Sequence, residues 1–202
     1  MRSDRNSQPK LLGFAGHRRV ANEAGLRRVM REELVMMKER LGDGLIAMSS
    51  AAAGADLIFL RSCVELRVPI IVILPFPRER FAEDFEAVEE WEFAEKLMDV
   101  SLAQYIAPGG HAAPEAYQVV AGHLLDWSDA FLFAWNGKPP QGVGGTEETV
   151  MDACEMGIPS RVIDAENLEP RWSIPHEMGR KARHGFETRR ELLEHLDQRF
   201  YG

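Results

Sequence analysis

Short apolar runs alternate along this chain with longer stretches in which apolar residues recur every three or four positions. The run at 70–74, IIVIL, is continuous and β-branched, as expected of a central parallel strand that is covered on both faces. Residues 26–41 place their apolar side chains on one face of a helix. The predicted strands cover residues 11–15, 44–50, 70–74, 101–107, 130–135 and 161–164.

Helices are predicted between these strands. Because strands and helices alternate, the predicted fold class is α/β, a Rossmann-like three-layer sandwich with a mostly parallel central sheet, followed by a C-terminal arm and helix. The predicted helices cover residues 26–41, 56–67, 78–100 and 116–129, with a further one that begins near Thr146.

The chain is predicted to divide into three parts. Residues 1–10 are polar and unpatterned, which is typical of a flexible N-terminus. Residues 11–164 form the Rossmann-like domain. Residues 165–202 are predicted to be an arm, irregular around Pro170 and Trp172, and then a basic helix. The arm and helix are expected to pack on the domain or on a partner subunit, and a lid over a phosphate is the alternative.

A glycine-rich loop separates the apolar run 130–135 from the helix that begins near Thr146. The first N–H groups of a helix lack intrahelical partners, and the macrodipole favours an anion there. Gly144 and Gly145 leave the backbone uncovered, and Thr146 can cap the helix and donate its hydroxyl to the same anion. The loop therefore predicts a phosphate site. The alternative is a tight turn whose glycines serve its geometry.

Loops that follow parallel strands gather at one edge of the sheet. Residues 16–19, 49–56, 74–77 and 142–148 are therefore expected to converge there. The planar, forked side chain of Arg18 suits a phosphate, although an arginine after a strand is often merely exposed. Asp56 lies in the first turn of its predicted helix, where it either stabilises the helix dipole or contacts a ligand.

Four segments carry a family resemblance: GFAGHR at 13–18, AGAD at 53–56, WNGKP at 135–139 and GVGGT at 142–146. They are similar to successive signatures of the SLOG superfamily, Rossmann-like proteins that include DNA-processing-A proteins, Lonely-Guy nucleotide hydrolases and stand-alone nucleotide-binding domains. The resemblance covers about residues 11–164 and implies a stand-alone member that binds a nucleotide or nucleotide-derived ligand. The residues that it implies for the ligand and its phosphate are Gly16, His17, Arg18, Gly54, Asp56, Tyr117, Gly144, Gly145, Thr146 and Glu147.

The sequence departs from the hydrolases of that superfamily, which carry Pro-Gly-Gly-x-Gly-Thr-x-Glu-Glu. Glu148 aligns with the first motif glutamate, but Thr149 replaces the second, and the catalytic arginine segment is not recognisable. Hydrolysis of an N-glycosidic bond needs a carboxylate beside the ribose, and Glu148 is the candidate. Its alternative role is a first-turn glutamate that complements the helix dipole. Asn136 stands where related sequences often have aspartate.

The 202 residues carry a net charge of −8, which argues against nucleic acid or a membrane surface as a partner. A local site for a small anion is compatible with that charge. No apolar run approaches the length of a membrane span and no leader pattern is present, so we expect a cytoplasmic protein with Cys63 and Cys154 reduced in its core. The glutamates of 78–100 are expected to form a solvated face rather than an acid–base pair.

Three functions compete on this evidence. The first is binding or sensing of a nucleotide-like ligand without turnover, because the loops converge and the hydrolase motif is broken. The second is hydrolysis of nucleoside 5′-monophosphates through Glu148. The third, an accessory DNA-binding protein, is the least favoured because the chain is acidic. No resident cofactor or metal is expected. The apolar face of the C-terminal helix and the family resemblance together favour a homodimer or higher oligomer.

Overall fold

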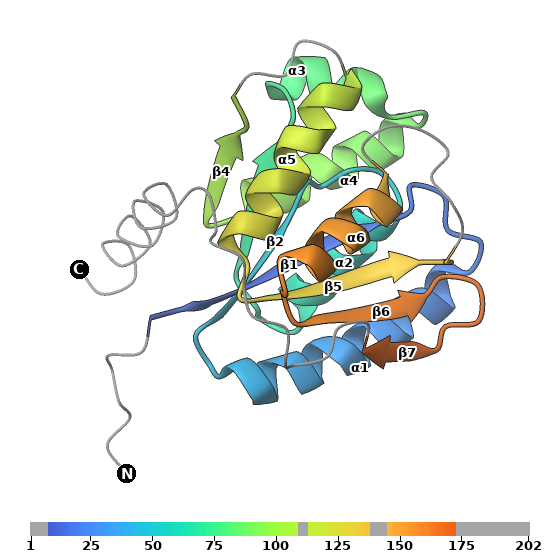
Figure 1. Cartoon of the computed structure of the whole chain (residues 1–202). Coiled ribbons are helices and arrows are strands. Elements are labelled where there is room, and N and C mark those ends of the chain that lie inside the picture. Colours follow the sequence, from blue (N-terminus) through green and yellow to red (C-terminus); the bar gives the residue numbers. More distant parts are fainter. Residues whose placement is uncertain (1–7, 109–112, 138–144, 173–202) are drawn as a thin grey trace.

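The computed structural model describes residues 8–108, 113–137 and 145–172, and the structural statements below concern these residues. Their strands form one seven-stranded sheet in the order β4-β3-β2-β1-β5-β6-β7, parallel except for the last pair (Figure 1). The strands are β1 (Lys10–Gly16), β2 (Leu45–Ser49), β3 (Ile70–Leu74), β4 (Ala103–Ile106), β5 (Ala130–Trp135), β6 (Ser160–Asp164) and β7 (Pro170–Trp172).

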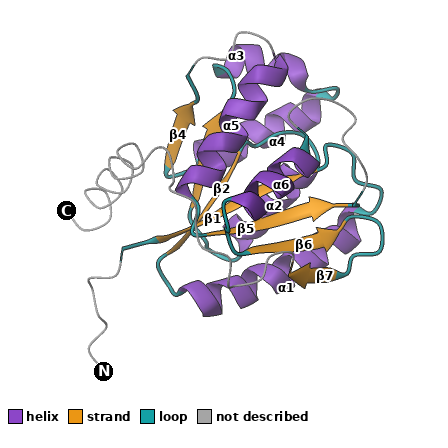
Figure 2. Ribbon diagram, in the orientation of Figure 1, coloured by secondary structure: helices purple, strands orange, loops and turns teal. Residues whose placement is uncertain are grey.

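Helices cover both faces of the sheet, which gives three layers (Figure 2). The buried apolar side chains form two clusters, one beneath α1, α2 and α4 and the other beneath α5 and α6. The predicted α/β class is therefore confirmed. No helix among the described residues is long and apolar enough to cross a membrane. The helices are α1 (Glu23–Leu41), α2 (Ala55–Glu65), α3 (Arg78–Phe81), the 3-10 helix η1 (Ala82–Asp84), α4 (Val88–Asp99), α5 (Ala113–Trp127) and α6 (Thr146–Glu155).

The central strands are apolar on both faces because a helix layer lies on each side. All five residues of β3 are buried, with Ile70 and Val72 in one cluster and Ile71 and Ile73 in the other. From β1 the chain builds outward to β4 and then crosses to β5, on the other side of β1. The strand order therefore reverses between β1 and β5. In open α/β sheets, ligands bind beyond the carboxyl ends of the strands at such a point.

The single helix predicted over 78–100 is broken into three pieces, so that prediction is wrong in detail. Phe85 and Ala87 are extended, with φ, ψ of −100°, 133° and −119°, 135°. The break lets the rings of Phe81, Phe85 and Trp91 pack together, with centroids 5.3 Å apart for Phe81–Phe85 and 5.2 Å for Phe85–Trp91. Tertiary packing of aromatic rings here overrides a local pattern that is compatible with a continuous helix.

The arm predicted from residue 165 is not irregular around Pro170 and Trp172. Residues 170–172 form β7, which pairs antiparallel with β6 at the end of the sheet. Pro170 is compatible with this strand because an edge strand leaves one row of its backbone groups without a ladder partner. Residues 173–202, which include the predicted basic helix, lie outside the described residues.

A buried ion pair fixes α1 on the sheet. The guanidinium of Arg161 on β6 donates from Nε and Nη2 to the carboxylate of Glu33 on α1, the second contact at 2.7 Å. The two side chains are 12% and 8% exposed. A bidentate pair of this kind is directional as well as charged, so it sets the position of α1 relative to β6.

Replacing Glu33 by alanine removes the carboxylate of α1 from a buried guanidinium. We expect the free energy of unfolding to fall by about 3–5 kcal/mol, measured by urea denaturation. Glu32→Ala is the matched control, because Glu32 is the next residue and forms an exposed pair with Arg28. It should cost less than about 1 kcal/mol. Equal losses in the two variants would show that the buried pair does not fix the helix.

Candidate functional site

The loops that follow β1 and β5 meet where the strand order reverses. Gly16 pairs with Ala134, and the backbone N–H of His17 donates to the carbonyl of Ala134 at 3.2 Å. Nε2 of His17 lies 3.0 Å from Oδ1 of Asn136 and 3.2 Å from its backbone nitrogen. A protonated Nε2 donates to the amide oxygen, whereas an unprotonated Nε2 accepts from the backbone N–H. In either state His17 ties the two loops together.

The loop after β1 also packs against the amino end of α2, at two positions that lack a side chain. Gly54 has a φ of 83°, and a Cβ there would lie 2.1 Å from the carbonyl oxygen of Arg18. A Cβ at Gly16 would lie 2.6 Å from that of Ala55, whose N–H donates to the carbonyl of His17 at 3.0 Å. Close packing of the two segments accounts for both glycines, and a ligand contact at either stays a prediction.

Arg18 extends from this loop over an aromatic ring. Its guanidinium carbon lies 4.7 Å from the centroid of the Tyr117 ring on α5. The hydroxyl of Tyr117 donates to Asp84 at 2.7 Å, and Asp84 accepts from Arg80 at 3.0 Å. Burial and the bond to Asp84 raise the pKa of Tyr117, so its hydroxyl keeps its proton. These contacts fix the ring, and the ring supports one face of an exposed arginine.

Asp56 is buried beside this loop, at the first turn of α2. Its side chain accepts from the hydroxyls of Ser49 at 2.8 Å and Ser50 at 2.5 Å. Burial raises the pKa of Asp56, and the two hydroxyl donors and the charge of Arg18 oppose that rise. Asp56 therefore holds the turn between β2 and α2. A contact between Asp56 and a ligand stays a prediction.

The amino end of α6 differs from the prediction. Gly145 is the cap, with φ, ψ of −79° and 169°, whereas Thr146 is already helical. The prediction that Thr146 caps the helix is therefore wrong. Glu147 Oε2 is buried and has no hydrogen-bond partner among the described residues. Glu148 is exposed and accepts from Nε2 of Gln118 on α5 at 3.2 Å. Gly144 lies outside the described residues.

The predicted loops meet only in part within the described residues. The segment after β3 joins the site through Phe76, whose ring packs edge-on against Tyr117 with centroids 6.4 Å apart. By contrast, Gly145, Thr146 and Glu147 make no hydrogen bond to Arg18 or Tyr117 in the part of the chain that is described. Phosphate binding at the Gly-Gly-Thr turn therefore stays a prediction.

The glutamates of α4 are not all on a solvated face. Glu89 and Glu92 are exposed as expected. Glu90 is half-buried, and its Oε1 accepts from the backbone N–H of Gly54 at 3.0 Å. A carboxylate from α4 thus lies at the amino end of α2, and the expectation of a purely solvated face is wrong for this residue.

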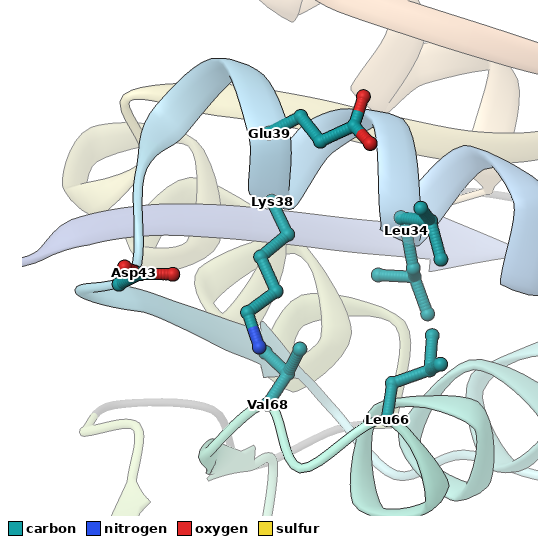
Figure 3. A pocket seen from close by; sticks show the side chains of 7 residues that line it. Leu34, Lys38, Glu39, Asp43, Leu66 and Val68 are labelled. Atoms are coloured by element: carbon teal, nitrogen blue, oxygen red, sulfur yellow. The ribbon is translucent and has the colours of Figure 1, made fainter.

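A separate hollow of about 340 Å³ lies at the opposite edge of the sheet. It is formed by the last turns of α1 and the connections that lead into β2 and β3 (Figure 3). Leu34 and Leu66 line it from opposite sides, and Lys38 extends toward Val68. Because it adjoins the amino ends of the parallel strands, it is not where such sheets place their ligands.

The described residues contain no cluster of three or more histidine, cysteine, aspartate or glutamate side chains suited to a metal ion. Both cysteines are free thiols. Cys63 is fully buried on α2, and burial raises its pKa well above the ordinary value, so this thiol stays protonated.

Several solved structures are similar to this chain at low sequence identity. DNA processing protein A from Helicobacter pylori, a protein that binds single-stranded DNA, has a similar structure. The TM-score is 0.53 and the identity 13%, over 96% of this chain and 83% of that one. DNA processing protein A from Streptococcus pneumoniae matches with a TM-score of 0.49 and 13% identity, over 95% of this chain and 56% of that one. The molybdenum cofactor carrier protein of Chlamydomonas reinhardtii gives 0.45 and 14%, over 77% of each chain. No family model and no curated protein matches.

The likeness to the Helicobacter protein shows a shared fold at low identity. It agrees with the fold that the SLOG resemblance implies, and membership of that superfamily stays a resemblance. It also corrects one expectation. The argument from the net charge of −8 excludes nucleic acid as a partner, yet a protein of this fold binds single-stranded DNA. That argument was wrong because net charge sums the whole surface, whereas binding depends on the charges near the site.

Two residues at this site could not be predicted from the sequence. Asp84 anchors Tyr117, and Glu90 contacts Gly54, although these partners lie 33 and 36 positions apart. Both acids fall in a stretch with regular helical periodicity and without glycine or proline, so no local signal marks the break that positions them. Asn136 stands where the sequences that this chain resembles often have aspartate, and its contact with His17 gives the position a structural role.

The buried carboxyl of Asp56 predicts a specific dependence of stability on pH. Its folded pKa is raised, so its contribution is fully present below the unfolded value of about 3.9 and is lost as the pH rises through the folded pKa. Urea denaturation between about pH 4 and pH 7 should show that Asp56→Asn gains stability relative to the wild type as the pH rises. Ser50→Ala should extend the loss to higher pH. Parallel profiles for wild type and Asp56→Asn would refute this role.

A substitution at Gly54 tests the close packing of the β1 loop against the amino end of α2. Gly54→Ala forces a side chain into a φ of 83° and against the Arg18 carbonyl, so we expect a loss of at least about 2 kcal/mol in urea denaturation. Gly122 on α5 is the control, because a Cβ there meets nothing within 4 Å. Gly122→Ala should gain up to about 1 kcal/mol. A tolerated Gly54→Ala would mean that the two segments separate easily.

Proposed function

We propose that this protein binds a nucleotide or nucleotide-derived ligand at the carboxyl edge of its sheet, with the phosphate near Arg18. The observation that carries the proposal is the stacking of the Arg18 guanidinium on Tyr117, beside the point where the strand order reverses. The ring holds the guanidinium plane in place while its N–H groups remain available at an exposed position.

Arg18 differs from most of the described arginines, which form ion pairs with carboxylates. Within the described residues Arg18 forms no ion pair with a carboxylate, and it is held by an aromatic face instead. An arginine supported in this way suits recruitment of an external anion, because binding does not first require an internal pair to break. The arginines that do form ion pairs with carboxylates are Arg19, Arg27, Arg28, Arg31, Arg61, Arg78, Arg80 and Arg161.

Single-stranded nucleic acid is a second candidate ligand. It is supported by the fold shared with the Helicobacter DNA processing protein A. An arginine stacked on a tyrosine suits either ligand, since backbone phosphates and base faces both interact with such groups. A nucleotide is preferred here because the described contacts centre on one arginine, whereas a bound strand needs several cationic contacts along its length.

Turnover of a nucleoside monophosphate requires a carboxylate beside the ribose. Glu148 is the residue proposed for that role, and it lies exposed at the first turn of α6 with its carboxylate on Gln118. Binding without turnover is therefore the preferred form of the proposal. Assay of the same samples for released free base distinguishes the two.

Thermal stabilisation tests the binding proposal. The purified protein is heated with AMP, cyclic dinucleotides, NAD, ADP-ribose or a single-stranded oligonucleotide. A ligand at about 100 times its Kd adds roughly 2.7 kcal/mol to the free energy of unfolding and raises the melting temperature. Arg18→Ala should abolish that rise. Arg28→Ala, an exposed arginine on α1, should leave it unchanged.

The pattern of melting-temperature rises distinguishes the candidate ligands. A rise with mononucleotides that is lost in Arg18→Ala supports the proposed site. A rise with the oligonucleotide alone would replace it by the second candidate. A rise that persists in Arg18→Ala would place the ligand elsewhere, and the absence of any rise would overturn the proposal.

A further inference from the structure

A short acidic segment lies against the loops of the proposed site. We call residues 82–90, which comprise η1, the link to α4 and the first turn of α4, the acidic strap. Three of its carboxylates accept hydrogen bonds from three different loops or helices. Asp84 accepts from the Tyr117 hydroxyl at 2.7 Å, Glu86 from Arg19 at 3.0 Å, and Glu90 from the Gly54 backbone N–H at 3.0 Å.

Two of these donors are of the kind that an anionic ligand would use. The Gly54 N–H is at the amino end of α2, where the helix dipole favours a negative charge. The second donor is the guanidinium of Arg19, the residue that follows Arg18 in the sequence. In the structure both donors already hold carboxylates of the chain itself, from Glu90 and Glu86.

The strap is held more firmly at its apolar side than at its acidic side. The Phe85 ring packs against Phe81 and Trp91, with centroids 5.3 Å and 5.2 Å away. By contrast, the Arg19–Glu86 pair has side chains that are 90% and 85% exposed, so water and salt screen it strongly. The Glu86 carboxylate can therefore exchange for another anion while the aromatic contacts keep the strap in place. Glu90 is half-buried, and its bond to the Gly54 N–H is the contact that a ligand would have to replace.

We propose that the acidic strap is a built-in competitor of the ligand: Glu90 and Glu86 occupy anion-binding donors in the free protein, and a bound phosphate displaces them. This inference rests on the proposed function. The apparent affinity for the ligand equals its intrinsic affinity multiplied by the fraction of molecules in which these donors are available. Every anion that needs these donors loses the same factor in affinity. A weakly held anion such as inorganic phosphate then no longer binds at ordinary concentrations, whereas a ligand that also stacks at Arg18 and Tyr117 still does.

The test compares two double variants with the same change in charge. Glu86→Ala/Glu90→Ala removes the two competing carboxylates. Glu89→Ala/Glu92→Ala removes two exposed carboxylates from α4. Affinities for AMP and for inorganic phosphate are measured by titration calorimetry on both variants, the wild type and Arg18→Ala. We expect AMP to bind at least about tenfold more tightly to Glu86→Ala/Glu90→Ala, as a bond to a charged group implies. The control should change by less than about twofold.

The gain should be the same factor for inorganic phosphate as for AMP, because the fraction of molecules whose donors are available is a property of the free protein and not of the ligand. Hydrogen exchange gives an independent measurement: AMP should increase amide exchange in residues 82–90 of the wild type. Should the double alanine variant fail to fold, Glu90→Gln and Glu86→Gln keep the shape and remove the charge.

The outcomes separate this inference from the proposed function. Equal gains in affinity for AMP in both double variants would show that only the net charge matters, and would refute the proposal that the strap competes with the ligand. Weaker AMP binding in Glu86→Ala/Glu90→Ala would make the strap part of the ligand site rather than its competitor. Binding that depends on Arg18 but is unaffected by the strap variants would leave the function standing without this regulation. Absence of binding in every protein would overturn both.

Discussion

The close approach of the β1 loop to the amino end of α2 is the contact on which the rest of the site depends. Gly16 and Gly54 make it possible, since a Cβ at either would overlap atoms of the facing segment. The backbone hydrogen bond from Ala55 to His17 follows from that approach. With the loop fixed at this depth, the side chain of Arg18 reaches the ring of Tyr117, and His17 reaches the loop after β5.

The fold was predictable because its signals are local. Each parallel strand is covered on both faces and therefore appears as a continuous apolar run, as in β3 and β5. Alternation of strands and helices then determines the layers, and the rule for parallel strands determines the edge at which loops gather. Arg18 and Tyr117 were both predicted for the same site, and the structure brings them into contact.

The remaining features were not predictable because they depend on long-range contacts. A helical pattern through 78–100 contains no residue that forbids a helix, yet the ring of Phe85 packs between Phe81 and Trp91 and the backbone opens there. The position of Glu90 beside Gly54 follows from that opening, 36 residues away in sequence. The strand β7 depends likewise on an available edge of β6, which residues 170–172 do not reveal. The prediction that Thr146 caps α6 is wrong because glycine can also be an N-cap, and Gly145 takes that position one residue earlier.

Charge at the site follows from local arrangement rather than from the net value. The chain carries 24 lysines and arginines against 32 acidic residues, and most described arginines are neutralised by a carboxylate. An anion is therefore attracted by those hydrogen-bond donors that the carboxylates of the chain leave available. Arg18 belongs to that set through its stacking on Tyr117, and the Gly54 N–H belongs to it when Glu90 moves away. An acidic surface around such a site does not prevent anion binding. It raises the strength of local contact that an anion needs, and so favours a ligand that offers a second interaction besides its charge.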